Sequence, residues 1–221
     1  PPVSVDPYKR TIRRIDDLVT EFKSTAGLSS EEAISIILYS GPMFTIYNGV
    51  LRQKPDIYTT LKGHGNLFPT TIFVLASALQ KLARVSRISA DTPLFRGLGG
   101  PGKFTMMKMP ECFDKPDEYG CTGFMDCAFL SFTADKAEAI KYSGVNDSKS
   151  AACLLEIRPN SIDRAADISK FSQFPKEKEF TFAPCSFVQR SGLERPSTVV
   201  LEDGKTGFLT IIPASVSANV S

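Results

Sequence analysis

The chain has 221 residues, of which 42% are hydrophobic and 23% are charged, and its formal net charge is +2. These values are typical of a soluble globular protein with an apolar core, and so small a charge argues against nucleic acid as a partner. A single histidine, His64, and five cysteines without a Cys-x-x-Cys pair exclude histidine-rich metal sites and argue against zinc.

Hydrophobic periodicity predicts a helical lobe over residues 1–90. Apolar residues recur every three to four positions, and Ser29 with Glu32 matches a capping box. Gly41-Pro42 should end the helix that this box begins. The helices are expected at 10–23, 31–40, 43–52 and 69–85, with a loop over 54–68.

After residue 91 the hydrophobic period changes from 3.6 to 2, which predicts strands. The strands are expected at 92–98, 128–133, 151–158, 180–189, 199–201 and 207–212, the last two as a hairpin, with a short helix at 135–142. Residues 103–127 and 160–169 are expected to be irregular, and 214–221 to be a frayed tail.

This order of elements predicts an α+β fold in one domain over 1–221. The helical lobe would be followed by a mostly antiparallel two-sheet β sandwich over 91–213. No apolar run approaches the roughly 20 residues that a membrane-spanning helix needs, so we expect no membrane contact. The first ten residues lack the apolar core of a secretion signal and look like an internal cut, so any targeting segment would lie upstream. We expect a monomer. The odd number of cysteines favours buried, reduced thiols, and one or two disulfide bridges are the alternative.

The segment 171–184 combines a turn-prone entry, two glutamates and an alternating strand. In a strand, Glu177 and Glu179 would project from one face, with Lys178 pointing away. Two adjacent carboxylates resist ionising together, so one group can stabilise a cation while the other takes a proton. Taken alone, the pattern is more often a solvated strand edge.

Two further signals lie upstream. Arg96 occupies an apolar predicted strand, where a charge needs a partner, and Gly97 beside it would let another group approach closely. An anion such as a diphosphate suits this arginine, and an internal salt bridge is the alternative. Ser131 and Thr133 share one face of the next strong strand, which by itself is an ordinary polar face.

Taken together, these segments resemble the R-S-E class of mono-ADP-ribosyltransferases, which includes cholera-type toxins and vertebrate ecto-transferases. The resemblance covers roughly residues 56–190. It rests on Phe95-Arg96-Gly97, Phe129-Leu130-Ser131-Phe132-Thr133 and Phe174-Pro175-Lys176-Glu177-Lys178-Glu179 in that order, with Asp167-Ile168-Ser169 and Ala183-Pro184 on either side. Two departures are Phe132, in the middle of the family's Ser-Thr-Ser, and Phe180, where related enzymes often have valine.

The resemblance implies the ADP-ribosyltransferase fold and transfer of ADP-ribose from NAD, as co-substrate and without a metal, to a protein side chain. Glu179 would stabilise the developing cation and Ser131 would fix its rotamer. The implied residues are Glu179, Glu177 and Ser131 for catalysis; Arg96, Gly97, Ser131, Thr133 and Glu179 for NAD; and Glu177, Phe171 and Phe174 for the protein substrate. Packing beneath the loop is the alternative for the two phenylalanines.

In this family Glu-x-Glu usually accompanies an arginine acceptor, and a threonine or serine, as on ubiquitin, is the alternative. The resemblance also favours a secreted bacterial type III effector that acts on a host protein in the host cytosol. An NAD glycohydrolase and an inactive interaction domain are the competing interpretations. Retention of Arg96, Ser131 and Glu179 together argues against the inactive domain.

Overall fold

The computed structural model describes residues 13–89, 91–99, 109–145, 152–160, 162–201 and 204–218. In these ranges five α-helices precede the first strand, as the α+β prediction required, and one short α-helix follows the third strand. The helices are α1 (Ile15–Ala26), α2 (Ser30–Leu38), α3 (Phe44–Leu51), α4 (Pro55–Gly63), α5 (Pro69–Val85) and α6 (Lys136–Lys141). The strands are β1 (Leu94–Gly97), β2 (Phe124–Asp126), β3 (Leu130–Thr133), β4 (Ala152–Ile157), β5 (Ala166–Asp167), β6 (Glu179–Phe182), β7 (Ser186–Arg190), β8 (Arg195–Val200) and β9 (Thr206–Ser217).

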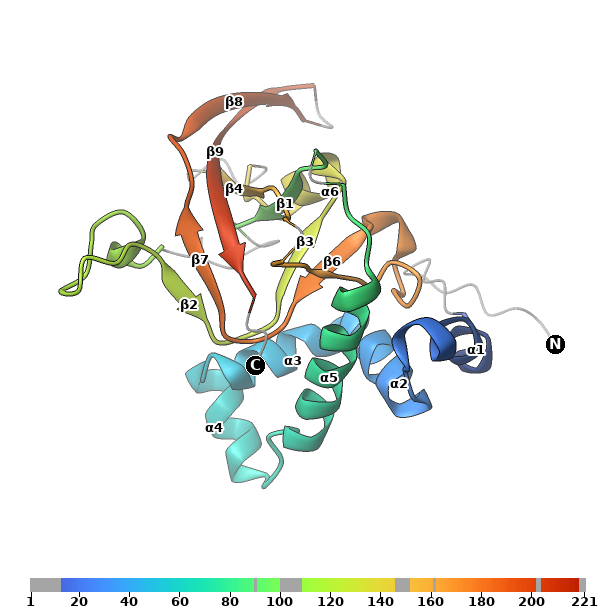
Figure 1. Ribbon diagram of the computed structural model, residues 1–221. Helices are drawn as coiled ribbons and strands as arrows, with labels where there is room; N and C mark the ends of the chain where they lie inside the picture. Colours follow the sequence, from blue (N-terminus) through green and yellow to red (C-terminus); the bar gives the residue numbers. More distant parts are fainter. Residues whose placement is uncertain are drawn as a thin grey trace.

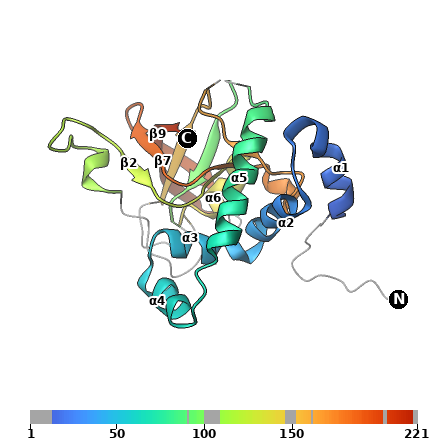
Figure 2. The same cartoon turned by 60° about the horizontal axis from the view of Figure 1, so that its bottom comes forward.

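Helices α1 to α5 gather on one side of the strands, and the β8–β9 hairpin extends on the opposite side (Figure 1). In the turned view, α5 crosses in front of the strands, with α1 and α2 beside it (Figure 2). The predicted bounds of α5 are confirmed, whereas the predicted loop over 54–68 is wrong because it contains α4. Pro55 stands in the first turn of α4, where a missing amide hydrogen costs nothing. The first three residues of the helix predicted at 10–23 lie outside the described ranges.

The capping box at the start of α2 is confirmed, and its glutamate also joins two helices. The Ser29 amide donates to Glu32 at 2.9 Å, and the Glu32 amide donates to the Ser29 hydroxyl at 3.3 Å. The Glu32 carboxylate also accepts from Ser77 and forms a 2.8 Å ion pair with Lys81, both on α5. These contacts hold α2 against α5 beneath the sheet.

One helical stretch, Ser30–Leu51, is long and apolar enough to cross a membrane by length and composition, which corrects the sequence-based statement that no such run exists. The stretch is interrupted at Gly41, whose φ of −96° and ψ of −154° are not helical. Its most apolar window is 56% buried inside the protein. The stretch therefore supplies core side chains to the helical layer.

The strands of the described residues join into one nine-stranded sheet in the order β2-β7-β9-β4-β1-β3-β6-β5, with β8 paired to β9. Every pairing is antiparallel except the one between β4 and β9. The mostly antiparallel character was predicted, but the two separate sheets were not found. The reason is that β1 pairs with β4 on one side and with β3 on the other, which connects the two halves.

Strand bounds depart from the prediction where the chain turns sharply. The strand predicted at 180–189 is split into β6 and β7 by a turn in which Cys185 has a positive φ of 63°. Short strands β5 and β2 lie in segments expected to be irregular. The predicted tail instead continues β9 through Ser217, because Val216 pairs with Val188 on β7.

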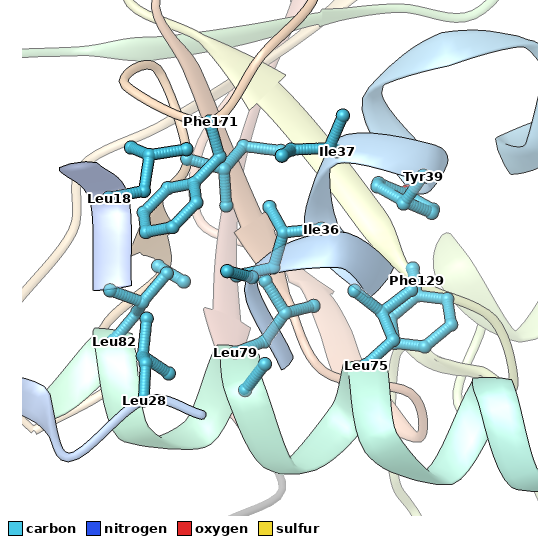
Figure 3. Close-up of a cluster of buried hydrophobic side chains, with 14 of the residues drawn as sticks. Leu18, Leu28, Ile36, Ile37, Tyr39, Leu75, Leu79, Leu82, Phe129 and Phe171 are labelled. Atoms are coloured by element: carbon cyan, nitrogen blue, oxygen red, sulfur yellow. The ribbon is translucent and has the colours of Figure 1, made fainter. Parts of the chain in front are cut away.

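The largest apolar core lies between the helices and the sheet. Its buried side chains come from α1, α2 and α5 and from the sheet side, and Figure 3 shows those of Leu18, Ile36, Leu79, Phe129 and Phe171 pointing toward one another. This core packs the helical layer against the start of β3 and the segment before β6. Side chains of the helical layer can therefore contact residues of β3.

Candidate active site

Three neighbouring strands bring together the residues that the sequence singled out. Strand β3 lies between β1 and β6. Phe95 pairs with Thr133 on one side of β3, and Ser131 and Thr133 pair with Thr181 and Glu179 on the other. Residues about 35 and 80 positions apart in the sequence therefore meet within one short stretch of sheet.

Arg96 on β1 is half-buried and fixed by the main chain of β3. Its guanidinium donates to the main-chain carbonyl of Ser131 at 2.8 Å. Burial lowers the pKa of Arg96, and the neighbouring positive charge of Arg52 lowers it further, whereas Tyr39, Asp126 and Glu179 act in the opposite direction. A buried guanidinium beside a second one favours the arrival of an anion.

Arg52 was missed in the sequence, where an arginine after an apolar helix is unremarkable. It caps the end of α3 and forms two parallel hydrogen bonds with the buried carboxylate of Asp126, at 3.0 and 2.8 Å. Asp126 also accepts from the amide of Ala128 at 3.0 Å. This paired geometry holds the Arg52 guanidinium in one orientation near Arg96.

Glu179 begins β6 and is half-buried. Burial raises its pKa to about 7, and the negative charge of Glu177 also raises it. Hydrogen bonds from Ser131 and Thr181 and the positive charge of Arg96 act in the opposite direction. The Thr181 hydroxyl donates to Glu179 Oε1 at 3.4 Å. A carboxyl with such a pKa changes its charge near neutral pH.

The helical layer contributes Tyr39 and Asn48, which the sequence analysis also missed. The Tyr39 side chain is 1% exposed, and its hydroxyl lies 2.8 Å from Ser131 Oγ. The Asn48 amide nitrogen donates to that hydroxyl at 3.4 Å, and the Asn48 amide oxygen accepts from the Phe129 amide at 3.1 Å. In the sequence both residues follow the apolar pattern of core helices, and no local signal distinguishes them.

Glu177 does not belong to the strand that carries Glu179, so the argument from alternation was wrong. It ends a short 3-10 helix, Pro175–Glu177, and Lys178 then takes a left-handed conformation with a φ of 45°. Thr133 holds this turn by donating its hydroxyl hydrogen to the main-chain carbonyl of Glu177. The two carboxylates are nevertheless near enough for Glu177 to raise the pKa of Glu179.

The side chain of Glu177 lies at the end of α6, near the ion pair between Glu138 and Lys141. The Tyr142 hydroxyl donates to its carboxylate at 3.4 Å. Burial raises the pKa of Glu177, the charge of Glu138 raises it further, and Tyr142 and Lys141 lower it. Burial together with the nearby Glu177 and Glu138 raises the pKa of Tyr142 to about 12.

Two of the residues expected at the site, Phe171 and Gly97, have other surroundings. Phe171 is 2% exposed and packs on Phe22, with ring centroids 4.9 Å apart, so the packing alternative holds for it. Phe174 is half-buried and remains a candidate for substrate contact. Gly97 does give room for a close approach, but the approaching group is the end of α6. A Cβ at this position would lie 2.4 Å from the carbonyl oxygen of Ala139 and 2.4 Å from the carbonyl carbon of Tyr142.

Within the described residues, no three histidine, cysteine, aspartate or glutamate side chains gather to hold a metal ion. A separate hollow of about 690 Å³ lies on the β8–β9 hairpin and is lined by Pro196, Thr198 and Phe208 among others. It contains none of the residues described above.

Solved structures of bacterial ADP-ribosyltransferases match nearly the whole chain. HopU1 of Pseudomonas syringae pv. Tomato DC3000 is 21% identical, with 96% of this chain and 91% of that chain covered and a TM-score of 0.59. The Vis toxin of Vibrio splendidus is 18% identical, with 96% and 90% covered and a TM-score of 0.56. The C3 exoenzyme of Clostridium limosum is 15% identical, with 96% and 100% covered and a TM-score of 0.53.

At these identities the likeness establishes the fold. No protein-family model matches the sequence, and no curated protein is similar enough to count as a match. The chain has the ADP-ribosyltransferase fold, an α+β fold with helices at its N-terminal side and one mixed, mostly antiparallel sheet.

Proposed function

From this fold and the side chains gathered on it, we propose that the protein transfers ADP-ribose from NAD to a side chain of another protein and releases nicotinamide. The observation that carries the proposal is the meeting of Arg96, Ser131 and Glu179 on three adjacent strands. The hydroxyl groups of Ser131 and Thr181 favour the charged form of Glu179. Arg96 lies on the other side of Ser131 and donates to its main-chain carbonyl.

Two guanidinium groups fit the diphosphate of NAD. Burial lowers the pKa of Arg96, and repulsion between Arg96 and Arg52 lowers it further. A diphosphate between them would offset this repulsion and accept several charge-assisted hydrogen bonds. Asp126 would keep Arg52 in place for this task. Gly97 is not needed for the proposed contact, because its open side is filled by α6.

Glu179 would stabilise the positive charge that develops on the ribose as nicotinamide leaves. A carboxylate about 4 Å from a unit positive charge contributes on the order of 4 kcal/mol at an effective dielectric constant near 20. That energy corresponds to about a thousandfold in rate. Ser131 and Thr181 would orient the carboxylate and favour its ionised form, so that it faces the reacting sugar without rearranging.

Glu177 would act on the acceptor. Its carboxylate lies near that of Glu179, and a cationic guanidinium of an arginine would relieve the repulsion between the two. The nearby Glu138 carboxylate already pairs with Lys141, and the Tyr142 hydroxyl is neutral near pH 7. For a threonine or serine acceptor, the same carboxylate would serve as general base, and a raised pKa makes it a better one. Arginine is the acceptor that this arrangement favours. Phe174, half-exposed on the same turn, would contact the acceptor protein.

Water is the alternative acceptor, which would make the protein an NAD glycohydrolase. The neighbouring carboxylates of Glu177 and Glu179 favour the transferase, because water needs no cationic recognition. The partner that we propose is a host protein reached after secretion, by analogy with the toxins of the same fold.

Release of nicotinamide from NAD by the purified chain tests the proposal. Wild-type protein should release nicotinamide, and Glu179→Gln should reduce the rate about a thousandfold. Glu118→Gln, at an exposed glutamate in the loop before β2, is the matched control and should retain the wild-type rate. Absence of nicotinamide release from wild-type protein, with and without an arginine-rich acceptor peptide, would contradict the proposal.

A further inference from the structure

We propose that Asn48 and Tyr39 are positioning residues for Glu179, because they set the direction of a hydrogen-bond chain that ends on its carboxylate. The chain starts in the helical layer, crosses to β3 and reaches β6. Its role in catalysis rests on the proposed function, whereas its effect on the Glu179 carboxyl can be measured without any substrate.

The chain consists of four successive contacts. The Asn48 amide nitrogen lies 3.4 Å from the Tyr39 hydroxyl, which lies 2.8 Å from Ser131 Oγ. Ser131 Oγ lies 3.2 Å from the Thr181 hydroxyl, which donates to Glu179 Oε1 at 3.4 Å. Tyr39 and Thr181 are each 1% exposed, so water cannot easily replace these partners.

The direction of the chain is fixed at its first end by the main chain. The Phe129 amide can only donate, and it donates to the Asn48 amide oxygen at 3.1 Å. The Asn48 amide nitrogen therefore faces Tyr39 and acts as a donor. The Tyr39 hydroxyl accepts that hydrogen, and its own single hydrogen is left for Ser131.

The other end requires the same direction. An ionised carboxylate only accepts, so the single hydrogen of Thr181 is directed to Glu179. Ser131 must then donate toward Thr181 or Glu179, and it can do so because Tyr39 satisfies one of its lone pairs. All hydrogens in the chain point toward Glu179. Such a series favours the charged carboxylate, and each link polarises the next.

Several charged groups face the same carboxyl. Glu177, on the turn before β6, opposes its ionisation, while Arg96 on β1 favours it. The Tyr39 hydroxyl and the Tyr142 hydroxyl after α6 remain neutral near pH 7, since each has a pKa of about 12. Burial and Glu177 push the proton onto Glu179, and the hydrogen-bond chain is the short-range feature that opposes them.

Tyr39→Phe is the central test, because it removes only the hydroxyl and keeps the buried ring. The pKa of Glu179 is measured by carbon NMR of the side-chain carboxyl in glutamate-labelled protein without ligand, with Glu179→Gln to assign the signal. We expect a higher pKa for Glu179 in Tyr39→Phe than in wild type. We also expect kcat for nicotinamide release at pH 7 to fall three- to tenfold, with KM for NAD unchanged.

Tyr47→Phe is the matched control. Tyr47 is also 1% exposed and lies on α3, but its ring packs on Phe68 and it takes no part in the chain. A purely structural role for Tyr39 would lower the melting temperature of both variants and leave the Glu179 titration as in wild type. That result would overturn the proposal.

The direction of the chain has its own test. Asn48→Asp keeps an acceptor for the Phe129 amide but loses the donor, so Tyr39 would turn its hydrogen away from Ser131. Asn48→Asp also adds a negative charge, which by itself raises the pKa of Glu179. The same substitution in the Tyr39→Phe background measures this charge effect alone. In the background that retains Tyr39, the pKa of Glu179 should rise by more than that. Equal rises in the two backgrounds would contradict a directed chain. If wild-type protein releases no nicotinamide but these titrations behave as expected, the proposed function fails and the chain stands.

Discussion

Glu179 lies directly across from Thr133 in the antiparallel pairing of β3 with β6. The hydroxyl of Thr133 also donates to the main-chain carbonyl of Glu177 and accepts from the amide of Asp135, which caps α6. One residue of β3 therefore fixes the backbone beside both glutamates and the start of the helix next to them. The aromatic Phe132 between Ser131 and Thr133 does not disturb this arrangement, because it is 2% exposed and packs in the sheet core.

Substitutions of Glu177 and Glu179 should have different effects on NAD hydrolysis and on ADP-ribose transfer. Glu177→Gln should retain much of the NAD hydrolysis and lose transfer to an arginine-rich peptide by about a hundredfold or more, because water needs less positioning than a guanidinium. Glu179→Gln should lose both activities. Parallel measurement of nicotinamide release and of ADP-ribosylated peptide by mass spectrometry distinguishes the two. Equal losses of both activities in Glu177→Gln would contradict the division of roles.

The rate of nicotinamide release should rise with pH through an inflection near 7. Glu179 stabilises a cation only when it is ionised, and burial raises its pKa to about 7. At NAD concentrations well below KM, where the rate reports ionisation in the free protein, the rate at pH 6 should therefore be about fivefold lower than at pH 7, and it should level off above pH 8. A flat profile from pH 5 to 8 would mean that the ionisation of Glu179 does not limit the reaction.

Loss of either arginine should weaken NAD binding. Arg96→Lys and Arg52→Lys keep the charge but lose the planar fork, and each should raise KM for NAD about tenfold with a smaller change in kcat. Arg195→Lys is the control, since Arg195 on β8 forms a comparable 2.8 Å ion pair with Glu156 on β4. Unchanged KM in both site variants would place the diphosphate elsewhere.

Local patterns were enough to predict α5, the capping box and the strands that carry Arg96 and Ser131, and they predicted a strand from the residue after Glu179. Each of these signals lies within a few residues of sequence, where periodicity and capping chemistry act. The resemblance to a family then indicated which polar residues meet. The split of 180–189 into two strands depends on the positive φ of Cys185. A positive φ is uncommon for residues other than glycine, so the sequence does not predict it at a cysteine.

The contributions of the helical layer could not be predicted from the sequence. Tyr39 reaches Ser131 over 92 positions of sequence, and Arg52 reaches Asp126 over 74. Tyr39 directly follows α2 and Arg52 directly follows α3, so both contacts are set by packing of these helices against the sheet. Neither residue interrupts the apolar pattern that precedes it. A tyrosine in an apolar helical pattern is ordinarily interpreted as a core residue. The hydrogen-bond partner of its hydroxyl can be identified only from the structure.

Glu179 should lower stability at neutral and alkaline pH. Its pKa is about 7 in the folded protein and 4.5 in the unfolded chain, so the folded state holds the proton more tightly. The stability that this proton contributes is fully present below pH 4.5 and is lost as the pH rises through 7. Glu179→Gln should therefore increase the free energy of unfolding by about 1–3 kcal/mol at pH 8 and by little at pH 4. Urea unfolding at the two pH values measures this, and a gain of equal size at both would exclude the titration as its cause.

Gly97 should be required for folding rather than for NAD. A Cβ at this position would lie 2.4 Å from the Ala139 carbonyl oxygen, a main-chain atom that cannot swing aside. Gly97→Ala should therefore reduce the free energy of unfolding by about 1–3 kcal/mol in urea denaturation, while the folded fraction keeps the KM of wild type. Gly63→Ala is the matched control, because a Cβ there meets nothing within 4 Å and alanine favours the helix that Gly63 ends. If Gly97→Ala has wild-type stability and a raised KM for NAD, the added methyl group interferes with NAD and not with the fold. That result would place Gly97 in the NAD site.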